Sequence, residues 1–344
     1  MEPPRHLLLQ WHLTERCNLR CTHCYQSGER VPELPFDELL AILDQFTGLL
    51  RTYKSKGHVT VTGGEPFVRT DFLPLLEVLA RRRDELTFAV LTNGTLLDAK
   101  LAARLATLRP SFVQVSLEGS EATHDSIRGK GNYRKAVEAL RVLVKAKVQT
   151  QISFTAHRGN YREFPEVARV GRQLGVTRVW ADRLIPSGEG QALRDLSLSP
   201  EQVREFFELM WAARAEGRRR WFGRTEISMR RALQSLVAGG RPYHCTAGDT
   251  LLTVLPNGDL VPCRRMPIVV GNLMTTPLRT LYEDHSLLRA LRDRSKVSAG
   301  CGKCGLSGSC RGGLRCLAFA LTGDPFRADP GCWLASASPE LSAP

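Results

Sequence analysis

Three cysteines near the N-terminus have a spacing that suits a metal centre. Cys17, Cys21 and Cys24 form a C-x3-C-x2-C pattern, and Tyr25 follows directly. Three thiolates at this spacing can bind one small metal centre, but they do not complete the four-ligand site of structural zinc. A [4Fe–4S] cluster normally takes four cysteines, one for each iron. Three ligands would leave one iron open for catalysis. The alternatives are an incomplete zinc site or three unrelated core cysteines.

Seven further cysteines follow residue 244, and none lies between Cys24 and Cys245. This gap predicts two separate metal-bearing regions. Asn257-Gly258, between two apolar runs, predicts a tight hairpin that could bring flanking cysteines to one metal. Because C-x2-C pairs also serve zinc ribbons, zinc remains the alternative to iron in this region. The seven are Cys245, Cys263, Cys301, Cys304, Cys310, Cys316 and Cys332.

A second group of candidate residues follows an apolar, β-branched run at 58–62. The tetrapeptide is Gly63-Gly64-Glu65-Pro66. Glycine lets a ligand approach the backbone closely, and proline stiffens the turn. Backbone carbonyls and the Glu65 carboxylate could therefore bind a ligand ammonium group. Without the cysteines upstream, the tetrapeptide would be an ordinary loop.

These residues lie where predicted strands end. Strand-like runs alternate with helix-like runs six times over about 180 residues, and this order predicts a parallel sheet with helical crossovers. Six units are fewer than the eight of a closed barrel, so we expect an α/β fold with a partial (β/α)6 TIM-like barrel. The predicted strands are 7–13, 58–62, 86–92, 112–117, 148–155 and 178–182, and the helices are 35–50, 71–82, 98–108, 133–145 and 164–174.

The chain changes character after the sixth strand. Ser199 and Pro200 have the residue types of a helix N-cap and first turn, and we expect a basic helical stretch from there toward Leu236, ended by Gly239-Gly240. We therefore divide the chain into a barrel at 1–190, a helical bridge at 191–240 and a small cysteine-rich domain at 241–344. His124, Asp125 and Arg128 form a polar run that we interpret as a loop network.

The C-x3-C-x2-C-aromatic motif resembles the cluster motif of the radical S-adenosylmethionine (radical SAM) enzymes, whose core fold is the same partial barrel. The resemblance implies that the first three cysteines hold a [4Fe–4S] cluster whose open iron chelates S-adenosylmethionine. Gly63-Gly64-Glu65-Pro66 resembles the motif that holds the amino group of this ligand. By position, Asn93 and Ser116 resemble residues that contact its carboxylate or ribose, and Ile185 one that supports adenine.

The C-terminal cysteines resemble the SPASM extension of these enzymes, which binds two auxiliary iron–sulfur clusters. The resemblance implies two ligand sets. In the usual pattern the last two cysteines of the central group are separated by three residues, whereas five separate Cys310 and Cys316 here. One set would be Cys301, Cys304, Cys310 and Cys332, and the other, with an open iron, Cys245, Cys263 and Cys316.

The resemblance implies a radical reaction. One electron, from a donor such as flavodoxin or ferredoxin, enters the first cluster, S-adenosylmethionine is cleaved, and the 5′-deoxyadenosyl radical takes a hydrogen atom from the substrate. Relatives with this extension most often oxidise or crosslink a ribosomally made peptide or protein. The alternative is decarboxylation or side-chain removal on a tetrapyrrole, a haem precursor. The residues 311–332 resemble both kinds of relative, and the sequence identifies no general base.

The composition of the chain indicates which classes of molecule it could bind. The 344 residues carry a net charge of +13, which indicates either a solvated basic surface or a polyanionic partner such as an acidic peptide leader or a carboxylate-rich tetrapyrrole. We find no nucleic-acid module, no membrane-length apolar run and no signal peptide, so we expect a cytoplasmic protein. No peptide-recognition domain precedes Leu7, so a leader-binding module would be another chain. A zinc-bearing, non-enzymatic protein that binds RNA or protein is the alternative from another class.

Overall fold

Six parallel strands form the centre of one curved sheet in the computed structural model, which describes residues 4–26, 31–218 and 225–335. The sheet has ten strands in the order β10-β9-β8-β1-β2-β3-β4-β5-β6-β7. The strands are β1 (His6–His12), β2 (Lys56–Thr62), β3 (Leu86–Thr92), β4 (Val113–Ser116), β5 (Thr150–Ala156), β6 (Arg178–Arg183), β7 (Glu226–Ile227), β8 (Leu251–Val254), β9 (Asp259–Val261) and β10 (Gly271–Asn272).

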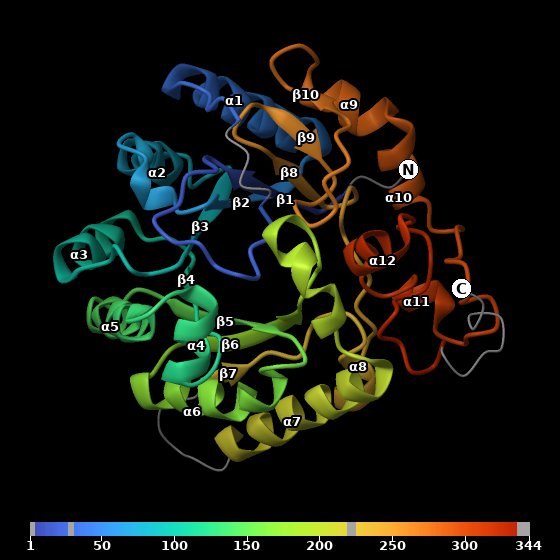
Figure 1. The fold of residues 1–344 in the computed structure, drawn as a ribbon. Coiled ribbons are helices and arrows are strands. Elements are labelled where there is room, and N and C mark those ends of the chain that lie inside the picture. The colour runs from blue at the N-terminus through green and yellow to red at the C-terminus, as the bar shows by residue number, and fades with distance from the viewer. Residues whose placement is uncertain (1–3, 27–30, 219–224, 336–344) are drawn as a thin grey trace.

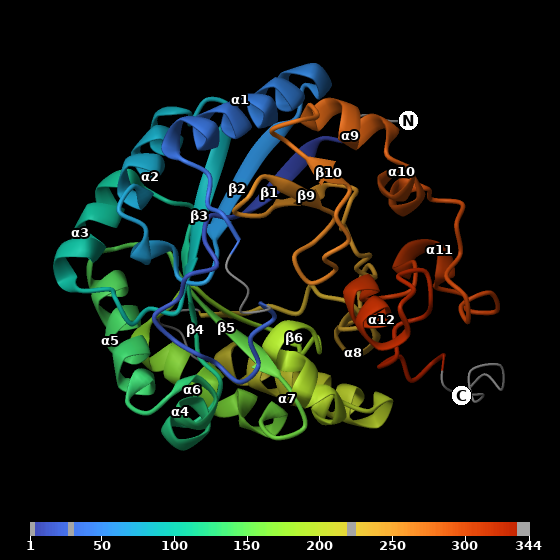
Figure 2. The same cartoon turned by 45° about the horizontal axis from the view of Figure 1, so that its top comes forward.

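Helices cover the outer side of this sheet, as in a partial (β/α) barrel (Figures 1 and 2). In the barrel and bridge they are α1 (Phe36–Tyr53), α2 (Phe72–Arg81), α3 (Ala99–Leu108), α4 (Glu121–Arg128), α5 (Asn132–Lys145), α6 (Phe164–Leu174), α7 (Pro200–Arg218) and α8 (Ser235–Ala238). Each long helix buries one apolar stripe; in α1 this stripe includes Leu39, Ile42, Leu43 and Phe46. The alternation of six strands with helices is as predicted, so the sequence prediction of a partial barrel is confirmed.

Local signals set several helix ends. Asp98 caps α3, because its carboxylate accepts a hydrogen bond from the Leu101 amide at 2.7 Å. Gly175 ends α6 in the left-handed conformation, with φ of 72°, as its sequence position predicts. Helix α7 begins at Pro200, also as predicted.

Two sequence predictions were wrong. The polar run that includes His124 and Arg128 is helix α4, not a loop, and the Ser120 hydroxyl accepts a hydrogen bond from the Thr123 amide at its start. The helical bridge does not continue toward Leu236. After α7, and beyond residues 219–224, which lie outside the described residues, the chain forms β7 alongside β6. Just before β7, the Thr225 hydroxyl donates to the Val176 carbonyl at 2.7 Å.

The cysteine-rich region continues the barrel sheet. The predicted hairpin at Asn257-Gly258 is present between β8 and β9, and β8 pairs in parallel with β1. Within the described residues four helices follow, and both views place α12 near α8 (Figures 1 and 2). They are α9 (Leu278–Asp284), α10 (Ser286–Arg292), α11 (Ser307–Cys310) and α12 (Arg315–Thr322). The C-terminal region is therefore joined to the barrel through backbone hydrogen bonds as well as side chains.

Within the described ranges, no helix is both long and apolar enough to cross a lipid bilayer.

Candidate functional site

A cavity of about 1210 Å³ lies where the barrel strands end. The loop after β1 forms one wall, and the ends of β2 to β6 form much of the rest. It is larger than the roughly 300–1,000 Å³ of most small-molecule sites. Nine of the residues predicted to bind the cluster or S-adenosylmethionine line it: Cys17, Cys21, Cys24, Tyr25, Gly63, Gly64, Asn93, Ser116 and Ile185. Glu65 and Pro66 do not line it.

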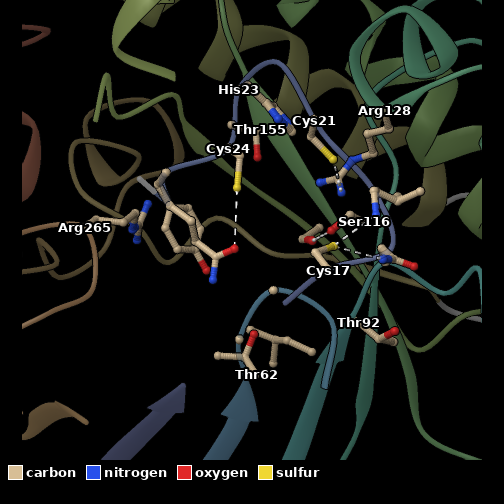
Figure 3. A pocket seen from close by; sticks show the side chains of 18 of the residues that line it. Cys17, Cys21, His23, Cys24, Thr62, Thr92, Ser116, Arg128, Thr155 and Arg265 are labelled. Carbon is tan, nitrogen blue, oxygen red and sulfur yellow. Dashed lines mark hydrogen bonds between the residues drawn. The ribbon is translucent and has the colours of Figure 1, made fainter. Parts of the chain in front are cut away.

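The three N-terminal cysteines are half-buried on this wall (Figure 3). Their sulfur atoms interact electrostatically with one another, and burial raises the pKa of Cys17 and of Cys24. The Cys17 sulfur accepts hydrogen bonds from the Leu19 amide at 3.4 Å and the Asn93 side chain at 3.8 Å. In the described part of the chain, no three His, Cys, Asp or Glu side chains surround a position for a single metal ion.

The Gly63-Gly64 turn packs against the loop that carries these cysteines. The Gly64 amide donates to the Thr14 carbonyl at 2.7 Å, and the Glu65 amide donates to the Arg16 carbonyl at 2.9 Å. A Cβ atom on Gly64 would lie 2.3 Å from the Arg16 carbonyl oxygen, so no side chain fits there. We expected glycine here because a ligand approaches. The structure adds a second reason, which is the approach of the cysteine loop itself.

The Glu65 carboxylate lies behind the cavity wall. It is fully buried and accepts hydrogen bonds from the Thr92 hydroxyl at 2.8 Å, the Asn93 amide at 2.8 Å and the Phe67 amide at 3.2 Å. Burial raises its pKa to about 7. To contact a ligand ammonium group, as the sequence suggested, this carboxylate would have to leave these partners. In this arrangement it holds the end of β3, and with it Asn93, against the cysteine loop.

A charged network beside Cys21 was not predicted from the sequence. Arg128, on α4, donates to the Cys21 sulfur at 3.7 Å and forms an ion pair with Glu118 at 2.6 Å. The His23 ring lies 3.2 Å from the same carboxylate. Burial opposes ionisation of Glu118, but Arg128 and His23 hold its pKa well below its usual range. The signal that could have identified Glu118 is its place directly after a strand.

The remaining predicted residues complete the wall. Tyr25 packs edge-on against His12 with ring centres 6.0 Å apart, and the Arg264 guanidinium lies 5.8 Å from its ring. Burial raises the pKa of Tyr25 to about 12. The Ser116 hydroxyl lies 3.4 Å from that of Ser153. Ile185 is almost fully buried just after β6.

The seven C-terminal cysteines form two groups, and all ten cysteines of the chain are free of disulfides. Cys301 interacts electrostatically with Cys304, Cys310 and Cys332, and burial raises its pKa to about 11. These four line a small cavity that Leu233, Leu236 and Pro242 help to close. Cys316 lies in α12 and does not line this cavity.

The second group consists of Cys316, Cys245 and Cys263. Cys316 interacts electrostatically with the other two, and burial raises its pKa strongly. All three residues are buried. The structure therefore brings the seven thiols together in the grouping that the resemblance implied, despite the longer spacing between Cys310 and Cys316. That they ligate clusters stays a prediction. Three groups of thiols, one on the large cavity and two in the C-terminal region, are a donor set that suits iron–sulfur clusters.

Comparison with known proteins adds the family context. The model of the Radical SAM superfamily matches residues 11–170, and that of the SPASM iron-sulfur cluster-binding domain matches 245–305. The mycofactocin maturase MftC of Mycobacterium tuberculosis is 32% identical over 98% of this chain and 85% of its own length. The AdoMet-dependent heme synthase of Methanosarcina barkeri is 28% identical over 94% of this chain and 95% of its own length.

Solved structures share the fold. Native anSMEcpe with bound AdoMet and the Cp18Cys peptide superposes with a TM-score of 0.78 at 19% identity, covering 96% of this chain and 95% of its own. Streptococcus suis SuiB bound to its precursor peptide SuiA has a TM-score of 0.71 at 17% identity, covering 94% of this chain and 74% of its own. At these identities the likeness concerns the fold.

Proposed function

Because this chain belongs to the radical SAM superfamily and carries a SPASM domain, we propose that it cleaves S-adenosylmethionine reductively at the site of Cys17, Cys21 and Cys24. The observation that carries this proposal is the convergence of three half-buried thiols on a cavity of about 1210 Å³ at the strand ends. In the proposal these thiolates hold a [4Fe–4S] cluster with one open iron. When bound, the cluster and S-adenosylmethionine supply the one-electron chemistry that yields a 5′-deoxyadenosyl radical, which takes hydrogen from the substrate.

We assign the chain's own residues supporting roles. The Gly63-Gly64 backbone faces the amino group of S-adenosylmethionine, with Glu65 and Pro66 holding the turn in shape. Asn93 and Ser116 contact the carboxylate or ribose of S-adenosylmethionine, and Ile185 packs beside its adenine. Tyr25, which directly follows Cys24, contributes to the same binding site. Arg128 places a positive charge next to the Cys21 sulfur. These roles agree with the position of each residue on or behind the cavity wall.

We further propose two auxiliary iron–sulfur clusters. The four thiols around the small cavity would hold one completely, and the three buried thiols would hold the other with one iron open. The clusters would accept the substrate electron or bind the substrate. A test is the iron content after anaerobic reconstitution: we expect about twelve irons per chain, four for each cluster. A content near four would contradict the auxiliary sites.

For the substrate we propose a ribosomally made peptide or protein, which the enzyme oxidises or crosslinks. The 32% identity to a maturase over nearly the whole chain supports this choice. The second candidate is a tetrapyrrole, because the heme synthase relative is 28% identical over 94% of this chain and 95% of its own length. Both candidates suit a cavity of this size and a chain of net charge +13.

The test of the cleavage site uses reconstituted protein, S-adenosylmethionine and dithionite, which stands in for a flavodoxin or ferredoxin. Wild-type protein should release 5′-deoxyadenosine, measured by mass spectrometry. The variant with Cys17, Cys21 and Cys24 changed to alanine should release none and should lose about a third of the iron. As a matched control, Cys301→Ala with Cys304→Ala should lose iron and still cleave. Cleavage by the first variant, or zinc in place of iron in anaerobically purified protein, would overturn the proposal.

The substrate test adds candidate peptides or porphyrins to the same reaction. Under our proposal, a peptide increases 5′-deoxyadenosine release and gains a mass change. Stimulation by a porphyrin alone would exclude the peptide and favour the tetrapyrrole. A short peptide reading frame next to this gene would identify which peptide to use first.

A further inference from the structure

The end of β6 places a charged cluster where the barrel meets the C-terminal region. Asp182 of β6 and Arg265 both line the large cavity. Arg265 Nη1 donates to Asp182 Oδ2 at 2.9 Å, and Arg231 Nη2 donates to the same oxygen at 2.6 Å. We call these three residues the Asp182 cluster.

The charges of the Asp182 cluster do not balance. Among these three side chains, two guanidinium groups share one carboxylate, which leaves one positive charge on Arg265 that faces Cys263 and Cys316 as well as the cavity. The neighbouring Arg183 does not change this sum, because it is buried and paired with Asp329 at 2.8 Å. Burial opposes ionisation of Asp182, but Arg231 and Arg265 hold its pKa well below its usual range, so it stays charged. The excess charge would attract one further anion.

The two arginines are not equally available to a ligand. Arg231 donates through both Nε and Nη2 to Asp182, and its guanidinium lies 5.4 Å from the Trp180 ring and 5.3 Å from the Tyr243 ring. It also does not line the cavity. The Arg265 side chain is 23% exposed, and among the described residues it makes one hydrogen bond, to Asp182. A guanidinium has five N–H donors, so Arg265 retains donors for a ligand.

The position of Arg265 is also informative. It interacts electrostatically with Cys263 and Cys316 of the buried three-cysteine group, while its side chain lines the cavity that holds Cys17, Cys21 and Cys24. In the view of Figure 3, Arg265 lies on the other side of these three cysteines from Arg128. A group bound by Arg265 would therefore share the cavity of the proposed radical site and contact a side chain that neighbours the proposed auxiliary site.

We propose that Arg265, held in place by Asp182 and backed by Arg231, binds a carboxylate of the substrate. A guanidinium matches a carboxylate in shape as well as charge. The carboxylate could come from a peptide, as a C-terminus or acidic side chain, or from a tetrapyrrole propionate. The inference deepens the proposed function and rests on it in one respect, since it assumes that the substrate occupies this cavity.

The experiment compares binding of acids with that of their blocked forms by reconstituted holoenzyme. The probes are Fe-coproporphyrin III against its tetramethyl ester, followed by absorbance, and acetyl-Gly-Gly-Tyr against its C-terminal amide, followed by calorimetry. We expect wild-type protein to bind at least one acid about tenfold to a hundredfold more tightly than its blocked form. Arg265→Gln should abolish this ratio, and Arg265→Lys should retain part of it. If only the porphyrin and its ester differ in affinity, the carboxylate comes from a tetrapyrrole. If only the peptide and its amide differ, it comes from a peptide.

The matched control is Arg230→Gln, because the Arg230 side chain is 82% exposed and does not line the cavity. It should keep the wild-type ratio. Equal binding of acid and blocked form by wild-type protein, or a ratio that survives in Arg265→Gln, would overturn the inference and assign Arg265 to balancing the charge of the neighbouring thiolates. If Arg265→Gln loses iron, the test depends on the other two proteins. The wild type must bind the acid more tightly than its blocked form, and Arg265→Lys must retain part of that ratio, for the inference to hold. Failure of the proposed function is seen separately, as absence of 5′-deoxyadenosine without either probe.

Discussion

At the scale of single residues, the candidate site depends on a missing side chain. Gly64 lets the turn after β2 and the cysteine loop share backbone hydrogen bonds, and a Cβ atom there would meet the Arg16 carbonyl oxygen at 2.3 Å. Backbone atoms cannot move aside as a flexible side chain can. A methyl group at this position would therefore displace the loop that carries Cys17.

We predict that Gly64→Ala lowers stability by about 1–3 kcal/mol and reduces 5′-deoxyadenosine formation at least tenfold, because the displaced loop misplaces Cys17. Thermal midpoint and iron content, measured anaerobically, check this. The matched control is Gly48→Ala in α1, where an added Cβ meets nothing within 4 Å. It should stabilise the helix by about 0.5–1 kcal/mol. Wild-type iron content and activity in Gly64→Ala would contradict the assignment.

The raised pKa of Glu65 predicts that the stability of the protein depends on pH. Burial raises its pKa from 4.5 to about 7, so the folded chain holds a proton that the unfolded chain has lost. The resulting stability is fully present below pH 4.5 and disappears as the pH rises through 7. The difference corresponds to about 3 kcal/mol. Glu65→Gln removes the ionisation, and with it this dependence.

The measurement is the thermal midpoint of both proteins at pH 5 and pH 8. The wild type should lose more stability than Glu65→Gln between these values. Glu121→Gln, which removes a carboxylate whose side chain is 46% exposed, controls for the loss of one negative charge. Parallel pH profiles for wild type and Glu65→Gln would show that the buried carboxylate does not titrate in this range.

At the scale of elements, one buried ion pair joins the barrel to the four-cysteine region. Arg183, at the end of β6, donates through both Nη atoms to Asp329, and the two side chains are 3% and 1% exposed. Asp329 also accepts hydrogen bonds from the Leu314 and Gly331 amides, both at 2.9 Å. The pair therefore shapes the loop that ends at Cys332 as well as tying it to the sheet.

We predict that Arg183→Met costs about 3–5 kcal/mol, since it leaves the Asp329 carboxylate buried without its partner. Iron bound by the four-cysteine group should fall with it, while 5′-deoxyadenosine release without substrate persists. Thermal melting and iron analysis provide the readouts. The control is Arg169→Gln, which breaks the exposed Arg169–Glu166 pair on α6 and should change stability by less than about 0.5 kcal/mol. Equal stability changes in Arg183→Met and Arg169→Gln would mean that the buried pair contributes no more to stability than the exposed pair.

At the scale of the whole molecule, the C-terminal region is part of the barrel sheet. Strand β8 pairs with β1 from Leu8–Leu251 to Trp11–Val254, and β1 leads directly into the cysteine loop. The Arg264–Glu15 ion pair, at 3.1 Å, connects the same two regions. The boundary that we placed at residue 240 is thus crossed by the sheet.

We predict that a chain ending at residue 240 aggregates and binds no iron at Cys17, Cys21 and Cys24, because β1 becomes an unpaired edge strand. Size-exclusion chromatography and iron analysis check this. The full-length variant with Cys301→Ala and Cys304→Ala keeps β8 while losing iron, and should stay monodisperse. A soluble, iron-binding truncated chain would mean that the barrel stands alone.

The sequence by itself determined the features that depend on neighbours along the chain. The cysteine spacing, the alternation of strands and helices, the Asn257-Gly258 hairpin and the Asp98 cap all follow from local chemistry and periodicity. The family, and with it the partial barrel, followed from these same motifs.

Only the tertiary structure decided which distant residues meet. It turned Glu65 away from the cavity and placed Arg128 and Arg265 on the cavity wall. It also converted part of the expected bridge helix into β7. None of these contacts leaves a periodic or spaced pattern, because each depends on packing between segments tens to hundreds of residues apart. For that reason the sequence identified the kind of chemistry, whereas the fold identified the charges that surround it.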